Sequence, residues 1–284
     1  MAVDRLDAAG IAAVVDNAQQ CTVVTAGQAI HVTYGATRGI SPPTRKIDKD
    51  HYVDTRTGEL HEYKHTTSRA DAIRGVQRSI NRLRLVIDAN TDSRYQYLWV
   101  TLTYRDNVRD VARVYADYKR YNTRLRRKIG HYEYIAAIEP QARGAWHLHV
   151  LMIWQQTQRP YIPPHIVAGA WGQGYVKIHK VDRVSDIANY LCSYLTNTCD
   201  VMPDGTYNTH KGARLHLYPP GINIYRTSRG ITQPTRAAMA AADVDQMVQN
   251  MACTYTAGYS ITDAAGQPER RIVNRRYVKD DKQG

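Results

Sequence analysis

The sequence predicts an α+β protein built on a central antiparallel sheet, with helices on the faces of that sheet. Two observations lead to this fold class. Short runs rich in β-branched and aromatic residues alternate with segments whose apolar residues recur at helical spacing. In the middle of the chain these segments follow the order β-α-β-β-α-β-α, which is the order of a split β-α-β arrangement.

The two ends of the chain are expected to be extensions of one central domain. Residues 1–68 are weakly patterned and contain GATRGISPPTRKIDKD, a stretch rich in Pro, Gly and Thr that predicts loop or linker structure. We expect the central domain to span residues 69–230. The remaining residues, 231–284, are expected to form a C-terminal extension that packs on it.

The central domain is expected to begin with a helix over 69–87, where apolar residues recur at helical intervals between arginines. Four β-rich runs then predict strands: YQYLWVTLTY (95–104), HYEYIAAIE (131–139), WHLHVLMIW (146–154) and GYVKIHKV (174–181). Three segments predict further helices: VARVYADYKRYNTRLRRKI (111–129), PPHIVAGAW (163–171) and SDIANYLCSYLTN (185–197). In the split β-α-β (RRM/ferredoxin-like) topology, the strand before the second helix lies centrally, so 146–154 is expected at the middle of the sheet.

Composition favours a nucleic-acid partner. The formal net charge is +12, so the surface should attract polyanions, and nucleic acid is favoured over an anionic membrane because no basic amphipathic anchor is evident. Residues 105–128 contain nine basic and three acidic side chains, a pattern equally consistent with a phosphate-facing surface and with a solvated helix face.

Further compositional features bear on location and on the core. No apolar run of about 18 residues and no signal pattern occur, and the four cysteines are scattered, so we expect a soluble protein in a reducing, intracellular compartment. Phe is absent while Tyr occurs 21 times, so most tyrosines are expected to occupy core positions.

The strand WHLHVLMIW carries a candidate metal site. Side chains alternate faces along a strand, so His147 and His149 point the same way and could hold one metal ion. Glu139 ends the preceding strand, and the short connection folds its carboxylate back toward the histidines. The three residues form a candidate set of two histidines and one carboxylate. The alternative is a pair of histidines that merely hydrogen-bond to neighbours on a wet sheet face.

Two tyrosines of the helix at 185–197 are candidate nucleophiles. Tyr190 and Tyr194 stand four residues apart, so their phenols share one helix face, although such a pair also fits a core stripe. A phenol is a poor nucleophile until a nearby cation lowers its pKa or offsets charge in the transition state. A metal ion held by the histidines and the carboxylate would provide that cation.

These motifs resemble those of the HUH (His-hydrophobic-His) endonucleases, and among them the rolling-circle replication initiator (Rep) proteins of phages and small plasmids, two-tyrosine type. Three blocks carry the likeness in the family's order: YLWVTLTYRDN, EPQARGAWHLHVL and IANYLCSYLTN. KGARLHLYPPGINIYRTSRGI is similar to the tail of such Rep proteins. The resemblance covers roughly residues 95–230 and implies an HUH endonuclease fold for the central domain.

The resemblance implies a function and a role for each candidate residue. The protein would nick one strand of origin DNA at a single-stranded segment, remain attached to the 5′ phosphate through tyrosine, leave a 3′-hydroxyl primer, and later rejoin the strand. His147, His149 and Glu139 would be metal ligands and Tyr190 and Tyr194 nucleophiles, with Mg²⁺ or Mn²⁺ as cofactor; imidazole ligands favour Mn²⁺.

The resemblance also implies partners and a location, and it shows one departure. A host polymerase would extend the primer in the bacterial cytoplasm, and a host helicase is expected because no Walker-type phosphate loop occurs. The family's lysines that follow the tyrosines are replaced by Ser193 and Asn197, and Lys177 or Lys180 could substitute for them.

Three alternatives stay open. A relaxase or transposase of the same superfamily would share the chemistry and differ in the form of its DNA substrate. An iron-dependent oxygenase would use two histidines and a carboxylate but would need neither the basic charge nor the tyrosine pair. A non-enzymatic nucleic-acid-binding protein would bind by aromatic stacking, without metal and without cleavage.

Overall fold

The computed structural model shows an α+β protein with antiparallel sheets and divides the chain into two compact units. One unit combines Met1–His65 with Pro234–Gly284, and the other is Thr66–Gln233. The structure describes the following residues: 3–35, 44–55, 57–63, 73–141, 143–155, 161–181, 200–201, 207–208, 218–219, 221–262 and 268–279.

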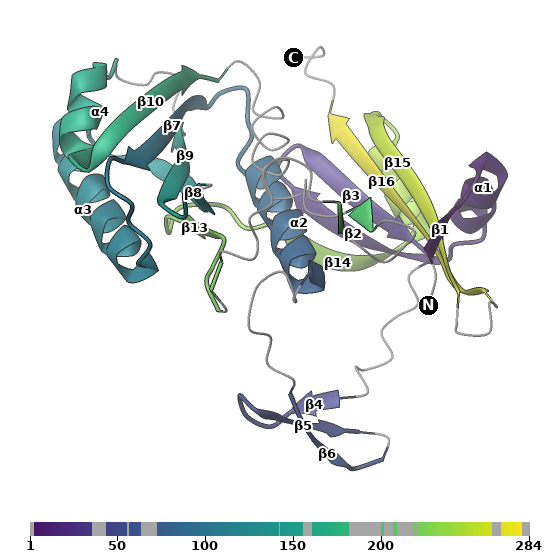
Figure 1. Ribbon diagram of the computed structural model, residues 1–284. Helices are drawn as coiled ribbons and strands as arrows, with labels where there is room; N and C mark the ends of the chain where they lie inside the picture. The colour runs from purple at the N-terminus through teal and green to yellow at the C-terminus, as the bar shows by residue number, and fades with distance from the viewer. Residues whose placement is uncertain are drawn as a thin grey trace. The chain divides into compact units, whose positions relative to one another are not determined.

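The unit Thr66–Gln233 contains a five-stranded antiparallel sheet in the order β10-β7-β9-β8-β13 (Figure 1). Its strands are β7 (Gln96–Tyr104), β8 (Glu133–Pro140), β9 (Trp146–Trp154), β10 (Gly174–Lys180) and β13 (Tyr225–Thr227). Its helices are α2 (Ile73–Ala89), α3 (Val111–Ile129) and α4 (Pro164–Trp171). A two-stranded ladder joins β11 (Asp200–Val201) to β12 (Tyr207–Asn208).

The elements expected for residues 95–181 are confirmed, including the central place of the histidine strand. Strand β9 runs antiparallel to both β7 and β8. Strands β7 and β8, which are connected through α3, therefore point the same way with β9 between them. The helix expected at 185–197 lies outside the described residues.

The two faces of this sheet have different roles. Register pairs Leu102 with Leu148 and Val100 with Val150, and these buried residues face α3 and α4. Tyr104 lies on the same face, where its hydroxyl donates to the Asp117 carboxylate of α3 and its ring packs edge-on against Trp171 of α4. The alternate residues, among them His147 and His149, therefore face the other side of the sheet. The two helices leave that second face available for chemistry.

Helix α3 has boundaries that its sequence explains. The Asp110 side chain accepts a hydrogen bond from the backbone N–H of Ala112 and so caps the amino end. The helix stops at Gly130, whose φ of 82° lies in a region that other residues rarely adopt. Its sole acidic residue, Asp117, is buried and forms ion pairs with Arg113 and Arg120. Part of the positive charge expected between 105 and 128 is thus neutralised within the helix.

Tyrosine fills much of the core, as the composition predicts. Tyr97, Tyr104, Tyr121 and Tyr132 are each less than a tenth exposed. Most of their hydroxyls find partners: Tyr97 donates to the Asn90 carbonyl and Tyr132 to the side-chain oxygen of Asn122. Burial raises the pKa of Tyr97 to about 12, so this phenol stays neutral.

The other unit joins the two ends of the chain in one sheet. Its six strands lie in the order β1-β15-β16-β3-β2-β14 and are all antiparallel. They are β1 (Val3–Arg5), β2 (Gln20–Ala26), β3 (Ala29–Tyr34), β14 (Thr235–Ala240), β15 (Met251–Thr262) and β16 (Pro268–Lys279). Helices α1 (Ala8–Asp16) and α6 (Ala241–Val248) contact this sheet. Pairing of β16 with β3 makes the two ends parts of one unit.

The core of this unit is aliphatic and contains the buried Cys21, Val32 and Val273. No sequence pattern indicated that residues 1–68 and 231–284 would share a sheet. The expectation that 231–284 pack on the central domain stays a prediction. A separate three-stranded sheet comprises β4 (Thr44–Lys46), β5 (His51–Asp54) and β6 (Leu60–Glu62).

Two tyrosine-to-phenylalanine substitutions should change stability in opposite directions. The Tyr121 hydroxyl is buried without a hydrogen-bond partner among the described residues, whereas that of Tyr104 donates to buried Asp117. Tyr121→Phe should raise the free energy of unfolding by up to about 1 kcal/mol, because an unsatisfied buried hydroxyl is removed. Tyr104→Phe should lower it by about 1.5 kcal/mol, because a hydrogen bond to a carboxylate is lost.

The measurement is urea unfolding followed by tryptophan fluorescence. All four tryptophans lie in Thr66–Gln233, so the signal reports on that unit. Equal shifts of the two midpoints in the same direction would contradict the assignment of the two hydroxyls.

Candidate metal centre

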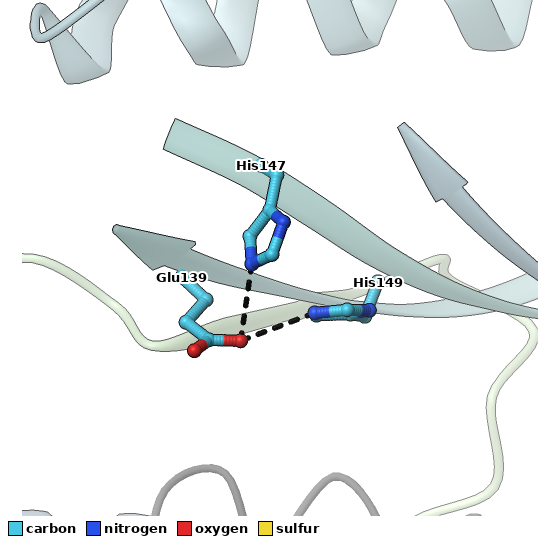
Figure 2. A group of neighbouring side chains, drawn as sticks. All are labelled: Glu139, His147 and His149. Carbon is cyan, nitrogen blue, oxygen red and sulfur yellow. Dashed lines mark hydrogen bonds and ion pairs between the residues drawn. The ribbon is translucent and has the colours of Figure 1, made fainter. Parts of the chain in front are cut away.

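A hairpin brings the expected ligands together. Glu139 on β8 pairs directly with His147 on β9, and Ala137 pairs with His149, so the carboxylate and both imidazoles project from one face. The connection is tight: the backbone N–H of Gln141 donates to the Ala145 carbonyl at 2.7 Å. Figure 2 shows the three side chains converging on the side of the strands away from the helix drawn above them.

The three side chains share one carboxylate oxygen. The Oε2 atom of Glu139 lies 3.1 Å from Nε2 of His147 and 3.1 Å from Nε2 of His149 (Figure 2). The rings of the histidines meet edge to face, with centroids 4.5 Å apart. Glu139 and His149 are each 4% exposed and His147 is half-buried, so the group opens to solvent through His147.

Burial and hydrogen bonding set the charges of this group. Burial alone would raise the pKa of Glu139, but the hydrogen bonds from the two histidines outweigh it, so the pKa lies below its ordinary value and the carboxylate is ionised. Burial lowers the pKa of His149, against the opposing hydrogen bond to Glu139. A neutral imidazole beside an ionised carboxylate is the protonation state that metal ligation requires.

Strand β7 positions the His149 ring. The Thr101 hydroxyl lies 3.3 Å from Nδ1 of His149, and Trp99 stacks on the same ring with a centroid separation of 5.5 Å and an interplanar angle of 18°. A hydrogen bond at Nδ1 fixes the tautomer and leaves Nε2 to act as ligand. Sequence reasoning missed both residues. Their signal was available, because Trp99 and Thr101 alternate in YLWVTLTY and so share the histidine face.

The donor set fits a divalent cation. One ligand atom from each of Glu139, His147 and His149 lies within 4.8 Å of the others, and the group is the part of the described chain in which His, Cys, Asp and Glu gather in this way. Two imidazole nitrogens with one carboxylate suit Mn²⁺ and later divalent metals and are compatible with Mg²⁺ supplemented by water. The metal's identity does not follow from the residues.

Other residues expected at the site divide into two groups. Tyr190 and Tyr194, together with Ser193 and Asn197, lie outside the described residues. Lys177 is exposed on β10 and pairs with Thr101, which pairs in turn with His149, so it lies in the same row on the histidine face. Lys180 pairs with Leu98, a register position of the opposite face. The structure therefore favours Lys177 over Lys180 as a cation near the site.

The chain matches a known protein family over this region. Residues 97–199 match the family model of the replication-associated protein ORF2, and this segment is a little over a third of the 284 residues. The match spans strands β7 to β10 and contains all three residues of the candidate metal centre. Searches of curated proteins and of solved structures gave no match. The family match supports a role as a replication initiator.

Membrane insertion through a helix finds no support in the described part of the chain, where no helix combines the length and the apolar character needed to cross a bilayer.

Metal affinity should depend on the Thr101 hydroxyl. Thr101→Val removes the hydrogen-bond partner of Nδ1 of His149 while keeping side-chain volume, so Mn²⁺ should bind about tenfold to hundredfold more weakly. Thr103→Val is the matched control, because Thr103 lies on the same strand and face but no hydrogen bond joins its hydroxyl to a histidine among the described residues. Electron paramagnetic resonance of free Mn²⁺ measures both affinities. Equal losses in the two variants would refute the assigned role of Thr101.

Proposed function

We propose that this protein initiates rolling-circle replication as a metal-dependent DNA endonuclease and ligase of the HUH type. The observation that carries the proposal is the buried Glu139, His147 and His149 group, which lies inside the region that matches a replication-associated family. The matched region also contains Tyr190 and Tyr194. The net charge of +12 suits a polyanionic substrate.

The strand arrangement supports the finer fold assignment within this proposal. The order β10-β7-β9-β8 with intervening helices α3 and α4 is compatible with a split β-α-β (ferredoxin-like) sheet, in which β9 inserts between the parallel strands β7 and β8. In that arrangement the central strand presents its histidines on the face opposite the helices. The helix expected at 185–197 would bring the tyrosines to the same face.

The cleavage step is a transesterification. The Oη atom of Tyr190 or Tyr194 attacks the scissile phosphorus, an O–P bond forms to the 5′ phosphate, and the bond from phosphorus to the 3′ oxygen breaks. The phenol proton passes to water, and the 3′ oxygen leaves as a hydroxyl. A divalent cation, when bound, polarises the phosphodiester and offsets charge on the leaving oxygen.

The protein's own residues perform the positioning in this step. Glu139, His147 and His149 hold the cation, and Thr101 and Trp99 orient the His149 ring. Because Ser193 and Asn197 stand where the family has lysines, Lys177 is the proposed source of positive charge beside the phosphate. Since one phosphodiester is exchanged for another, the reverse reaction rejoins the strand without an external energy source.

Partners follow from the products of the reaction. The released 3′ hydroxyl is a primer, so a host polymerase would extend it, and a host helicase would separate the strands ahead. A relaxase or transposase would carry out the same step on a different form of DNA. Cleavage of a supercoiled origin followed by primer extension distinguishes a replication initiator from both.

Adduct formation should depend on the two tyrosines and the metal ligands. With labelled single-stranded DNA and Mn²⁺, Tyr190→Phe and Tyr194→Phe should each retain a covalent protein–DNA adduct at reduced yield, and the double variant should form none. His149→Ala should lose the adduct while binding DNA nearly as tightly as the unaltered protein, because it removes a metal ligand rather than a DNA contact. Adduct yield is read on denaturing gels and its position by peptide mapping.

Tyr175→Phe is the control for loss of an exposed phenol on the histidine face, and it should leave the yield unchanged. An adduct that maps to neither Tyr190 nor Tyr194 would defeat the assignment of the nucleophiles. An adduct on a single tyrosine, with normal replication by the other's Phe variant, would reduce the mechanism to one nucleophile.

A further inference from the structure

A hollow of about 520 Å³ lies beside α3 on the helix-covered face of the sheet, away from the metal centre. Three cationic side chains line it, Lys119, Arg126 and Arg226, and no described residue that lines it is acidic. Three tyrosines also line it: Tyr115, Tyr118 and Tyr134. Its volume lies in the range of small-molecule sites, about 300–1,000 Å³. Its chemistry selects a ligand that is both anionic and aromatic.

The cations of the hollow are not neutralised by the acid of α3. Asp117 forms its ion pairs with Arg113 and Arg120, which do not line the hollow. Among the described residues, Lys119, Arg126 and Arg226 make no ion pair with a carboxylate. Positive charge concentrated in a concave surface attracts phosphate more strongly than charge on a convex one.

The aromatic groups are fixed before any ligand arrives. The guanidinium carbon of Arg226 lies 3.3 Å from the ring centre of Tyr115, and the Tyr115 hydroxyl donates to the Asn223 carbonyl. Tyr118 packs edge-on against Tyr134, with ring centroids 5.3 Å apart. A stacked guanidinium keeps its N–H donors in one plane, where they can bind two oxygens of a phosphate. Rings held in this way lose little freedom when a base stacks on them.

A second basic hollow extends the first around the edge of the sheet. It has a volume of about 410 Å³, is lined by Arg78 and Arg82 of α2 and by Tyr225 of β13, and shares Arg226 with the first. Again no described lining residue is acidic. Successive residues of β13 point to opposite faces, so Arg226 and Tyr225 place the two hollows on the two sides of this edge strand.

The second hollow leads toward the metal centre. Tyr225 pairs with Ala137, and Ala137 pairs with His149, so all three lie in one row on the histidine face. Two strand spacings separate Tyr225 from His149, about 10 Å. A chain of phosphates that passes around β13 would therefore connect the first hollow with the site of cleavage.

We propose that the hollow between α3 and β13 binds one nucleotide of the DNA strand outside the cleavage site, with the base against Tyr115 and Tyr134 and the phosphate on Arg226 and Lys119. Placing that nucleotide in the substrate strand rests on the proposed function. The selection of a nucleotide rests on the hollow itself, and a free nucleotide offers the same chemistry. The site would anchor the strand on one face of the sheet while its neighbouring segment is cut on the other.

The test compares two double variants that lose the same charge. Lys119→Ala/Arg226→Ala empties the hollow of two cations, and Arg127→Ala/Lys128→Ala removes two exposed cations of α3 that do not line it. Anisotropy of a fluorescein-labelled, mixed-sequence 30-mer of single-stranded DNA is measured with EDTA present, at several salt concentrations. The hollow variant should bind at least about tenfold more weakly than the control. Its slope of log affinity against log salt should fall by about 1.4, the value for two lost phosphate contacts on a single strand.

A second pair of variants tests the aromatic half of the site. Tyr115→Leu should weaken binding of the 30-mer by about fivefold or more, because base stacking on the ring is lost, whereas Tyr115→Phe should retain most of the affinity. Tryptophan fluorescence during urea unfolding confirms that each variant is folded. Equal affinity in the Leu and Phe variants would overturn the stacking role.

Calorimetry with deoxyadenosine monophosphate separates the two sources of nucleotide. Weaker binding of the 30-mer by the hollow variant supports a strand nucleotide. Loss of mononucleotide binding with an unchanged affinity for the 30-mer overturns the strand assignment in favour of a free nucleotide. Equal behaviour of the hollow and control variants toward both probes overturns the site altogether. Because no cleavage occurs in EDTA, these outcomes are independent of whether the unaltered protein forms a covalent adduct.

Discussion

The hydrogen bonds that the two histidines share with one carboxylate oxygen of Glu139 depend on a single feature, the register of the β8–β9 hairpin. A slip of one residue would turn His147 and His149 into the helix-covered core and bring Leu148 out to the other face. The register is secured from two directions. The tight connection between Gln141 and Ala145 limits the pairing at one end, and the fully buried Val150 fixes the face that meets the helices. The apolar core and the metal centre thus specify each other.

The same interaction explains why a cation suits this place. A buried carboxylate is unfavourable unless charge or hydrogen bonds compensate for lost water. Glu139 nevertheless stays ionised, because both imidazoles bond to it and hold its pKa below the ordinary value. Burial meanwhile keeps His149 from becoming a cation itself. The group therefore combines a fixed negative charge with neutral nitrogen donors in a small space, and a divalent ion satisfies all three at once.

Sequence patterns identified the central sheet and the metal candidates for a physical reason. Strands β7 and β9 are long and mostly buried, and helix α3 carries a regular apolar stripe, so local alternation and helical spacing mark their bounds within a few residues. Interactions between distant segments leave no such mark. The pairing of Val273 with Tyr34 unites the two ends of the chain, and neither strand carries a sign of its partner. Thr101 and Trp99 were in view as strand residues, but their contact with His149 required the β7–β9 register.

The basic surface follows the same division between local and distant information. Charge counting over residues 105–128 found an excess of cations but could not separate Arg120, which pairs with buried Asp117, from Lys119, which lines a hollow. These two neighbours differ because a helix turns about 100° per residue, which sends one to the acid and the other toward β13. Arg226 completes that hollow from more than a hundred residues away by stacking on Tyr115. The sheet therefore separates two tasks, with ionised Glu139 and its histidines on one face and uncompensated cations with aromatic rings on the other. A phosphate strand is attracted by the second set and reacts only at the first, so the edge strand β13, where the two faces meet, is the element that would relate binding to cleavage.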